Sequence, residues 1–240
     1  MIRTAPAAVF AVLALLLVFN FADQSLQSPL LDPLLADFFG RTADIVPLGW
    51  VTFVFTLCAA AATIAAGLLA GRGSRLRLCL AGSLTYGAIA VLSVLIPHGR
   101  IGYSVFFLAR ALAGFGIGLI VPSVFALASD LVAADRRSTA FGVLSVAMLA
   151  GRLAGFAAGG AFAANWRTAY ALIGAVNLAL AAALAALREP PRGIREPELR
   201  EAMLAGAVYR FRWTRKDAAA LKAAPSNLWL IFNFVDVIPG

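Results

Sequence analysis

Charged residues are scarce in this chain of 240 residues, because Asp, Glu, Lys and Arg together make up only 13% of it. Soluble globular domains carry about 25% charged residues. Hydrophobic residues, in contrast, reach 62%. This composition excludes an ordinary soluble domain and predicts an all-α membrane protein. In such a protein each crossing of the bilayer takes about 20 apolar residues.

Residues that build catalytic and metal sites are also few. The chain has one histidine, His98, and two cysteines, Cys58 and Cys79, which fall in or beside apolar segments without metal-ligand spacing. No apolar segment contains His-x-x-x-His, paired aspartates or a serine with a basic partner. We therefore expect no metal, no cofactor and no enzymatic activity.

Six apolar segments are each long enough to cross the hydrocarbon core of a bilayer. Because backbone polar groups in lipid need internal partners, we expect all six to be helices. The first helix could continue to about residue 36, with Pro29 marking a kink. The segments are 7–28, 47–70, 78–96, 102–128, 139–163 and 168–187, so residues 1–187 would form a six-helix transmembrane bundle.

Basic residues are distributed unevenly between the two ends of these spans. Of the 20 Lys and Arg, 15 lie in the amino terminus, the even-numbered loops and the tail, whereas Arg41, Arg100 and Arg167 lie in the odd-numbered loops. The positive-inside tendency places the amino terminus in the cytoplasm, and we expect a bacterial plasma (inner) membrane. The net charge of +8 then reflects topology and contact with anionic membrane lipids, without a nucleic acid partner.

The chain after residue 187 falls into two parts. Residues 188–225 are charged and partly helical, open with E-P-P-R-G, and are predicted to form a cytoplasmic linker between bundles. Residues 226–240 are apolar again and have the character of the start of a seventh span, but about 14 residues cannot cross a bilayer. Two interpretations stay open: the chain is a truncated part of a longer protein, or this segment lies at the membrane interface.

Two sequence motifs flank the third span. The loop after the second span reads G-L-L-A-G-R-G-S-R-L-R at 67–77, and the fourth span reads R-A-L-A-G-F-G-I-G at 110–118, before Asp130 and the pair Arg136-Arg137. Together with a glycine-rich fifth span, these motifs resemble the signature loop, fourth helix and fifth helix of the major facilitator superfamily. The stretch N-F-A-D-Q at 20–24 is most similar to bacterial Spinster-type lipid transporters of that superfamily.

This resemblance implies two six-helix bundles around a central cavity that opens alternately to each side of the membrane. The chain would supply the first bundle and the linker, and a C-terminal six-helix bundle would be its partner. In such proteins the signature loop gates the movement. The corresponding residues here are Gly67, Arg72 and Arg75.

Glycines in the fourth and fifth spans predict close helix packing. Gly151, Gly155 and Gly159 follow one another at four-residue spacing and so share one helix face. Without side chains, they let a neighbouring helix approach closely. We assign the same packing role to Gly114 and Gly118 of the fourth span.

Three charged residues lie inside apolar spans, where each needs a partner or a water-filled cavity. An arginine there costs about 2.5–3.5 kcal/mol on insertion scales, which favours a functional role for Arg110. Asp23 either pairs with Arg110 and releases it as a proton is taken up, or ends a short helix at the outer interface. Arg152 either faces the cavity as an anion-binding group or extends toward the membrane surface.

The predicted function is secondary active transport of a small organic or amphipathic solute by alternating access, coupled to protons. Asp23, Arg110 and Arg152 are the candidate substrate and proton-coupling residues. The alternative is a half-length or truncated membrane scaffold without independent transport activity. The substrate and the direction of transport stay open.

Overall fold

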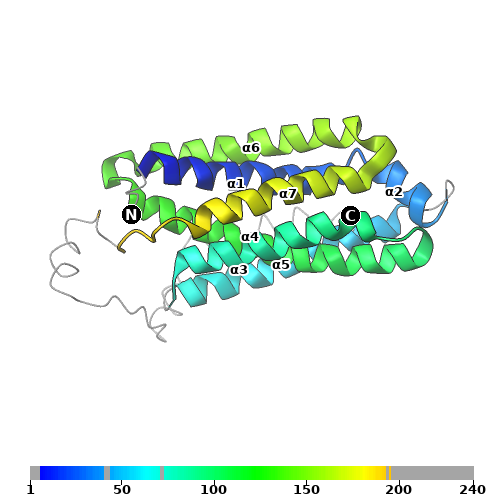
Figure 1. Cartoon of the computed structure of the whole chain (residues 1–240), viewed down its shortest axis with the longest axis horizontal. Coiled ribbons are helices and arrows are strands. Elements are labelled where there is room, and N and C mark those ends of the chain that lie inside the picture. The colour runs from blue at the N-terminus through cyan, green and yellow to red at the C-terminus, as the bar shows by residue number, and fades with distance from the viewer. Residues whose placement is uncertain (1–5, 41–43, 71–72, 193–194, 196–240) are drawn as a thin grey trace, which may run out of the picture. The chain divides into compact units, whose positions relative to one another are not determined.

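The computed structural model describes residues 6–40, 44–70, 73–192 and 195, and its regular structure in these ranges is entirely helical (Figure 1). A short helix, α2 (Leu31–Phe38), and three 3-10 turns, η1 (Leu92–Leu95), η2 (Ala134–Arg136) and η3 (Ala163–Asn165), lie between the long helices. The long helices are α1 (Pro6–Leu26), α3 (Val46–Ala70), α4 (Arg75–Val91), α5 (Gly99–Leu131), α6 (Arg137–Ala161) and α7 (Trp166–Ala185).

Six of these helical segments are long and apolar enough to cross a membrane, and they coincide with the six predicted spans. The all-α prediction with six spans is therefore confirmed. The seventh span predicted at 226–240 and the linker beyond residue 192, except Arg195, lie outside the described residues. The division of the chain into bundle, linker and seventh span thus stays a prediction.

The prediction that the first helix continues through Pro29 is wrong. α1 ends at Leu26, residues 27–30 form a turn, and α2 begins at Leu31. Proline lacks the amide hydrogen that a continuing helix needs, and its ring collides with the carbonyl one turn earlier. The turn is held instead by Gln27, whose Nε2 donates to the Leu48 carbonyl at 3.1 Å and to Thr52 Oγ1 at 3.0 Å on α3.

The long helices pack mainly against partners that are distant in the sequence. α1 lies against α6, α3 lies against α5, and α4 lies between α5 and α7. The connections gather at two ends of the bundle (Figure 1). We name them the Arg75 end, where α4 begins and α7 ends, and the Arg167 end, where α2 lies and α7 begins.

The α1–α6 interface is a contact of backbone against backbone. A Cβ atom on Gly151 or Gly155 would lie only 2.2 or 2.0 Å from the carbonyl oxygens of Val18 and Ala22 on α1. Gly159 continues the same face, where a Cβ would lie 2.3 Å from a ring atom of the proline in the α1–α2 turn. The four-residue glycine spacing therefore marks the face of α6 that α1 covers.

The α3–α5 interface has the same construction. A Cβ atom on Gly114 would lie 2.2 Å from the Phe55 carbonyl oxygen, and one on Gly118 would lie 2.3 Å from the Ala59 carbonyl oxygen. Real side chains essentially never approach backbone atoms this closely. Two pairs of helices, α1 with α6 and α3 with α5, are thus joined at distances that only glycine permits.

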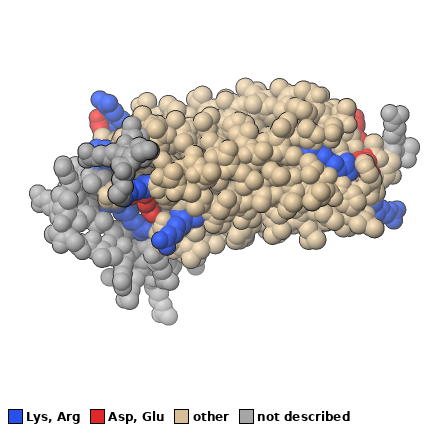
Figure 2. Space-filling model, viewed as in Figure 1, with Lys and Arg blue, Asp and Glu red and all other residues tan. Residues whose placement is uncertain are grey.

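One lateral face of the bundle is apolar along its middle. Figure 2 shows a face whose middle carries no Lys, Arg, Asp or Glu, while charged residues gather at both ends. Large exposed apolar side chains include Phe53, Leu57 and Ile64 on α3 and Val146, Leu153 and Phe156 on α6. This distribution matches helices whose ends meet water and whose middle meets lipid.

We expect Gly155→Ala to destabilise the bundle, because α1 would have to move away from the added methyl group. Overpacking of this kind typically costs about 1–3 kcal/mol. Thermal unfolding of the purified protein in detergent measures the effect as a lower midpoint. Gly160→Ala is the matched control, since no atom lies within 4 Å of a Cβ there. Equal midpoints for the two variants would contradict the close approach of α1 to α6.

Candidate functional site

A buried ion pair joins α1 to α5. Arg110 Nη1 donates to Asp23 Oδ2 at 2.7 Å, and the two side chains are 6% and 0% exposed. The two residues are 87 positions apart in the chain, so only the packing of the helices brings them together. Both were candidate site residues on sequence grounds, and the structure places them in direct contact.

Aromatic side chains from three other helices surround this pair. The Arg110 guanidinium carbon lies 4.5 Å from the ring centroid of Phe55 on α3 and 5.2 Å from that of Tyr170 on α7. Tyr86 of α4 is fully buried beside Asp23. Ring faces attract a guanidinium, and each such contact contributes about 0.5–2 kcal/mol. The sequence motifs pointed to none of these rings, because aromatic residues in a membrane span are usually packing residues.

The pair is held in surroundings that make a lone charge costly. Asn20, one turn before Asp23, is also fully buried, and its Nδ2 donates to the Leu16 carbonyl at 2.6 Å. Removing one partner from a buried ion pair typically costs about 3–5 kcal/mol. Asp23 and Arg110 therefore depend on each other for compensation of their charges in the bundle interior.

Arg152 does not belong to this buried site. It is exposed on α6, its guanidinium carbon lies 5.3 Å from the ring centroid of Phe21, and within the described residues no carboxylate lies in ion-pair distance. The three intramembrane charges predicted together are thus divided between two places. Asp23 and Arg110 lie in the bundle interior, whereas Arg152 lies on its surface.

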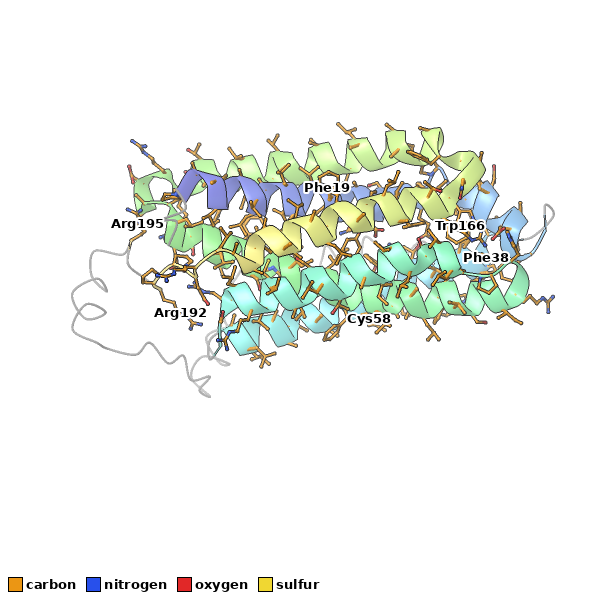
Figure 3. The ribbon with its side chains drawn as sticks, in the orientation of Figure 1. Phe19, Phe38, Cys58, Trp166, Arg192 and Arg195 are labelled. Atoms are coloured by element: carbon orange, nitrogen blue, oxygen red, sulfur yellow. The ribbon has the colours of Figure 1, made fainter. Side chains whose placement is uncertain are left out.

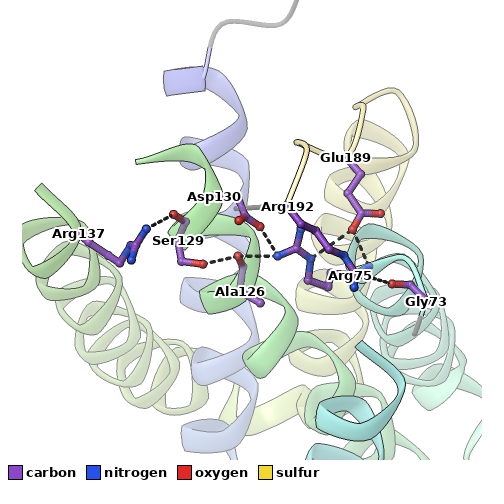
Figure 4. Close-up of polar contacts among 8 residues, drawn as sticks. All are labelled: Gly73, Arg75, Ala126, Ser129, Asp130, Arg137, Glu189 and Arg192. Atoms are coloured by element: carbon purple, nitrogen blue, oxygen red, sulfur yellow. Dashed lines mark hydrogen bonds and ion pairs between the residues drawn. The ribbon is translucent and has the colours of Figure 1, made fainter. Parts of the chain in front are cut away.

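A second ionic cluster fastens the Arg75 end (Figure 4). Arg75 forms ion pairs with Asp130 at the end of α5 and with Glu189 after α7, the latter at 3.3 Å, and donates to the Ala126 carbonyl at 3.3 Å. The Arg75 amide also donates to the Glu189 carboxylate at 3.0 Å. This cluster joins α4, α5 and the chain that follows α7.

Glu189 is held as a carboxylate in this cluster. Burial would raise its pKa, but hydrogen bonds from Ser74 and Arg75 outweigh burial and hold the pKa below its ordinary value. Arg192 also donates to the Gly73 carbonyl (Figure 4). The start of the predicted linker is therefore fastened to the loop between α3 and α4.

The three predicted gating residues differ in their positions and contacts. Arg75 lies at the centre of the cluster just described. Gly67 is exposed on α3, and no atom lies within 4 Å of a Cβ built on it. Arg72 lies outside the described residues. Of the two that can be placed, only Arg75 has polar contacts that could control a movement.

A third ionic cluster lies at the Arg167 end. Asp37 of α2 accepts from Arg167 Nη2 at 2.8 Å and is paired with His98. Arg167 Nε also donates to the Ile96 carbonyl at 2.8 Å, and the guanidinium carbon lies 4.3 Å from a ring centroid of Trp166. These contacts connect α2, the α4–α5 connection and α7. Phe38 of α2 and Trp166 of α7, whose rings are in contact, mark this end of the bundle in Figure 3.

Asp37 is ionised under ordinary conditions. Burial would raise its pKa, but hydrogen bonds from Arg167 and His98 outweigh burial and hold the pKa below the ordinary value. A cavity of about 1070 Å³ opens beside the cluster, lined in part by Asp32, Asp37, His98 and Arg167. Sequence analysis had placed Arg167 in an odd-numbered loop and gave no role to the other three residues. The available signal was the opposite charge of Asp37 and Arg167, which follow the first and the fifth spans on the same side of the membrane.

Comparison with known proteins identifies the fold. The sequence model described as Major Facilitator Superfamily matches residues 13–235. A bacterial homologue of the human lysosomal transporter Spinster, inward-facing and unoccupied, matches with a TM-score of 0.71 and 20% identity over 80% of this chain and 45% of that one. A peptide transporter POT in complex with sulfate matches with a TM-score of 0.64 and 20% identity over 97% of this chain and 46% of that one.

The chain spans about half the length of these solved structures. At 20% identity, the likeness shows a shared fold and not a shared substrate. A search of curated proteins found no significant match.

We expect Asp37→Asn to lower the thermal stability at pH 7, because a neutral amide loses the ionic attraction to Arg167 and accepts a weaker hydrogen bond from it. Since the pKa of Asp37 is lower in the folded state, its stabilising effect is present above the unfolded-state pKa and is lost as pH falls through the folded-state value. The difference in unfolding midpoint between wild type and variant should therefore be largest near neutrality and shrink below about pH 4.

Asp32→Asn is the control for this measurement. Asp32 is an exposed carboxylate on the same helix, and among the described residues it has no hydrogen bond or ion pair. It should show little change at any pH. A pH-independent loss in Asp37→Asn would mean that the ionised carboxylate does not stabilise the Arg167 end.

Proposed function

The chain belongs to the major facilitator superfamily, and we propose that its bundle is one half of a secondary active transporter that moves a small organic or amphipathic solute by alternating access, driven by protons. It is a multi-pass membrane protein of a transporter family. The observation that carries the proton-coupling proposal is the buried contact of 2.7 Å between Asp23 and Arg110.

A purely structural role explains this contact poorly. Buried ion pairs often add little net stability, and well-packed apolar residues of similar volume are often equally good or better. A pair whose carboxylate can gain or lose a proton can change the strength of its interaction, and apolar residues cannot. In the low-dielectric interior of the bundle, the neutral and ionised forms of Asp23 differ strongly in how they hold Arg110.

The position of the pair also suits a conformational switch. α1 is joined to α6, and α5 to α3, by glycine interfaces that leave little freedom. The ion pair is the buried polar link between the two pairs, which are also joined near their ends by hydrogen bonds of Gln27 to α3 and of Arg137 to α5. Proton uptake by Asp23 would loosen this link, and proton release would restore it. Alternating access needs such a two-state element, whose balance is biased by a ligand.

The clusters at the two ends support the same function. We propose that the Arg75 end faces the cytoplasm of a bacterial cell, since most basic residues lie on that side. There, Arg75 would link the signature loop to the start of the interbundle linker through Glu189. In the two-bundle arrangement of the superfamily, a C-terminal six-helix bundle would complete the transport pathway.

A membrane scaffold without transport activity of its own is the second candidate. The chain spans 45% and 46% of the length of the solved transporters that it matches. Reconstitution in liposomes separates the two candidates. Solute accumulation under a pH gradient, by this chain alone or together with a C-terminal six-helix bundle, supports the transporter, and its absence in both cases supports the scaffold.

We expect Asp23→Asn to abolish accumulation driven by a pH gradient while leaving solute exchange at equal pH intact. The asparagine cannot exchange a proton, but it has nearly the shape of aspartate. The measurement uses proteoliposomes and a solute first found by screening the wild-type protein under an imposed pH gradient. Retained exchange shows that the variant folds, which matters because breaking a buried pair costs about 3–5 kcal/mol.

Asp135→Asn is the control, because Asp135 is 75% exposed and, in the described part of the chain, pairs only with its neighbour Arg136 at 3.9 Å. It should accumulate the solute as wild type does. Unchanged accumulation in Asp23→Asn would contradict proton coupling through this pair. Loss of both accumulation and exchange is resolved by Asp23→Glu, which should restore gradient-driven transport if a titratable carboxylate is what matters.

A further inference from the structure

Asp23 needs a new hydrogen-bond partner when it takes up a proton. In the structure its Oδ2 accepts from Arg110 Nη1 at 2.7 Å. A protonated carboxyl group has an O–H that donates, whereas a guanidinium has five donors and no acceptor. Arg110 can therefore bind the carbonyl oxygen of neutral Asp23 but cannot accept from its O–H. Because a buried donor without an acceptor is unfavourable, proton uptake depends on an acceptor from another residue.

Three buried oxygen atoms near the pair are candidates for this acceptor. They are the hydroxyls of Tyr86 and Tyr170 and Oδ1 of Asn20, and none has a hydrogen bond of normal geometry among the described residues. Asp23 Oδ1 has none there either. Buried polar groups nearly always find partners, so a cluster of this kind is unusual. While the ion pair is formed, the site thus keeps acceptors that a neutral Asp23 can use.

The geometry favours Tyr86 among the three candidates. Its hydroxyl faces the Asp23 carboxylate. Tyr170 instead turns its ring toward Arg110, whose guanidinium carbon lies 5.2 Å from the ring centroid. Asn20 donates to the Leu16 carbonyl at 2.6 Å, and this bond holds its amide toward the preceding turn of α1, away from Asp23.

Close helix contacts hold Tyr86 in place. A Cβ atom on Gly116 of α5 would lie 3.0 Å from the Cβ of Tyr86. On the other side of α4, a Cβ on Gly87 would lie 3.1 Å from the Gly174 carbonyl oxygen of α7. The Tyr86 side chain is 0% exposed between these contacts. Because a ring enclosed in this way cannot swing aside, its hydroxyl stays beside Asp23.

We propose that Tyr86 is a positioning residue for proton uptake at Asp23, and that its hydroxyl oxygen accepts a hydrogen bond from the O–H of neutral Asp23. The titratable groups around this hydroxyl are Asp23 of α1, Arg110 of α5 and Tyr170 of α7. Of these only Asp23 is a base that can take up a proton, since a guanidinium is already protonated and a phenol is neutral.

The consequence is an exchange of partners between helices. Ionised Asp23 joins α1 to α5 through Arg110. Neutral Asp23 has lost the ionic attraction and joins α1 to α4 through Tyr86. The proton comes from the aqueous side that drives transport, and the O–H of Asp23 is the one covalent bond that forms. This inference rests on the proposed function and names a further residue that acts in it.

Infrared difference spectroscopy tests this hydrogen bond. Spectra of the protein in nanodiscs are recorded over a series of pH values and compared with those of Asp23→Asn, so that the carbonyl stretch of protonated Asp23 is identified by its loss. Hydrogen bonding of a carboxylic acid lowers the frequency of this stretch. In Tyr86→Phe we expect the Asp23 band at a higher frequency, because phenylalanine keeps the ring but offers no acceptor.

Tyr103→Phe is the matched control. Tyr103 lies two turns before Arg110 on α5, and its hydroxyl donates to the Pro47 carbonyl at 3.0 Å. Its removal should leave the Asp23 band at the wild-type frequency. Thermal unfolding midpoints show which variants are folded. A second measurement uses the wild-type sequence labelled with 3-fluorotyrosine. A fluorinated phenol is a weaker acceptor, so the band should move in the same direction by a smaller amount.

Two results would overturn the role of Tyr86. One is an unchanged Asp23 frequency in folded Tyr86→Phe or in the fluorinated protein, and the other is an equal shift in Tyr103→Phe. The proposed function fails in a different way. If no band is lost in Asp23→Asn at any pH at which the protein is folded, Asp23 takes up no proton, and both proposals are wrong. A band that is present but does not depend on Tyr86 refutes only the present inference.

Discussion

The contact between Asp23 and Arg110 is the interaction on which the rest of the bundle depends. Two opposite charges that are 0% and 6% exposed, in a part of the protein surrounded by lipid, have to lie together, because separating them would leave each without compensation. This requirement sets the distance between α1 and α5. It also explains the rings of Phe55 and Tyr170 around the guanidinium, since ring faces are apolar groups that still stabilise a cation.

Polar contacts and backbone contacts have separate roles in this bundle. Glycines such as Gly155 and Gly114 join helices in pairs so closely that a methyl group would not fit. Ionic clusters around Arg75 and Arg167 fasten the two ends, where water lowers the cost of a charge. Between the two ends, among the described residues, lies the buried pair of Asp23 with Arg110. The bundle thus combines close backbone contacts within two helix pairs with ionic contacts at both ends and one ion pair in its interior.

Arg110 and Arg152 illustrate how environment decides the role of a residue. Both are arginines within apolar spans, and both lie against phenylalanine rings. Arg110 is buried and paired with a carboxylate of the same bundle, and the proposed proton coupling rests on this pair. Arg152 is exposed, and among the described residues no carboxylate lies in ion-pair distance of it. Burial therefore separates two arginines that the sequence had grouped as one candidate site.

The sequence by itself determined the six spans, since the thickness of a bilayer demands long apolar helices, and it indicated the pairing of Asp23 with Arg110, since opposite charges in lipid need each other. It also marked the glycine face of α6. Only the tertiary structure decided that α1 covers this face and that the first helix ends at Leu26, before the turn that contains Pro29. It also decided that Asp37 contacts Arg167, which is 130 positions away in the chain. Periodicity and composition report local structure, whereas contacts over such separations depend on how whole helices pack.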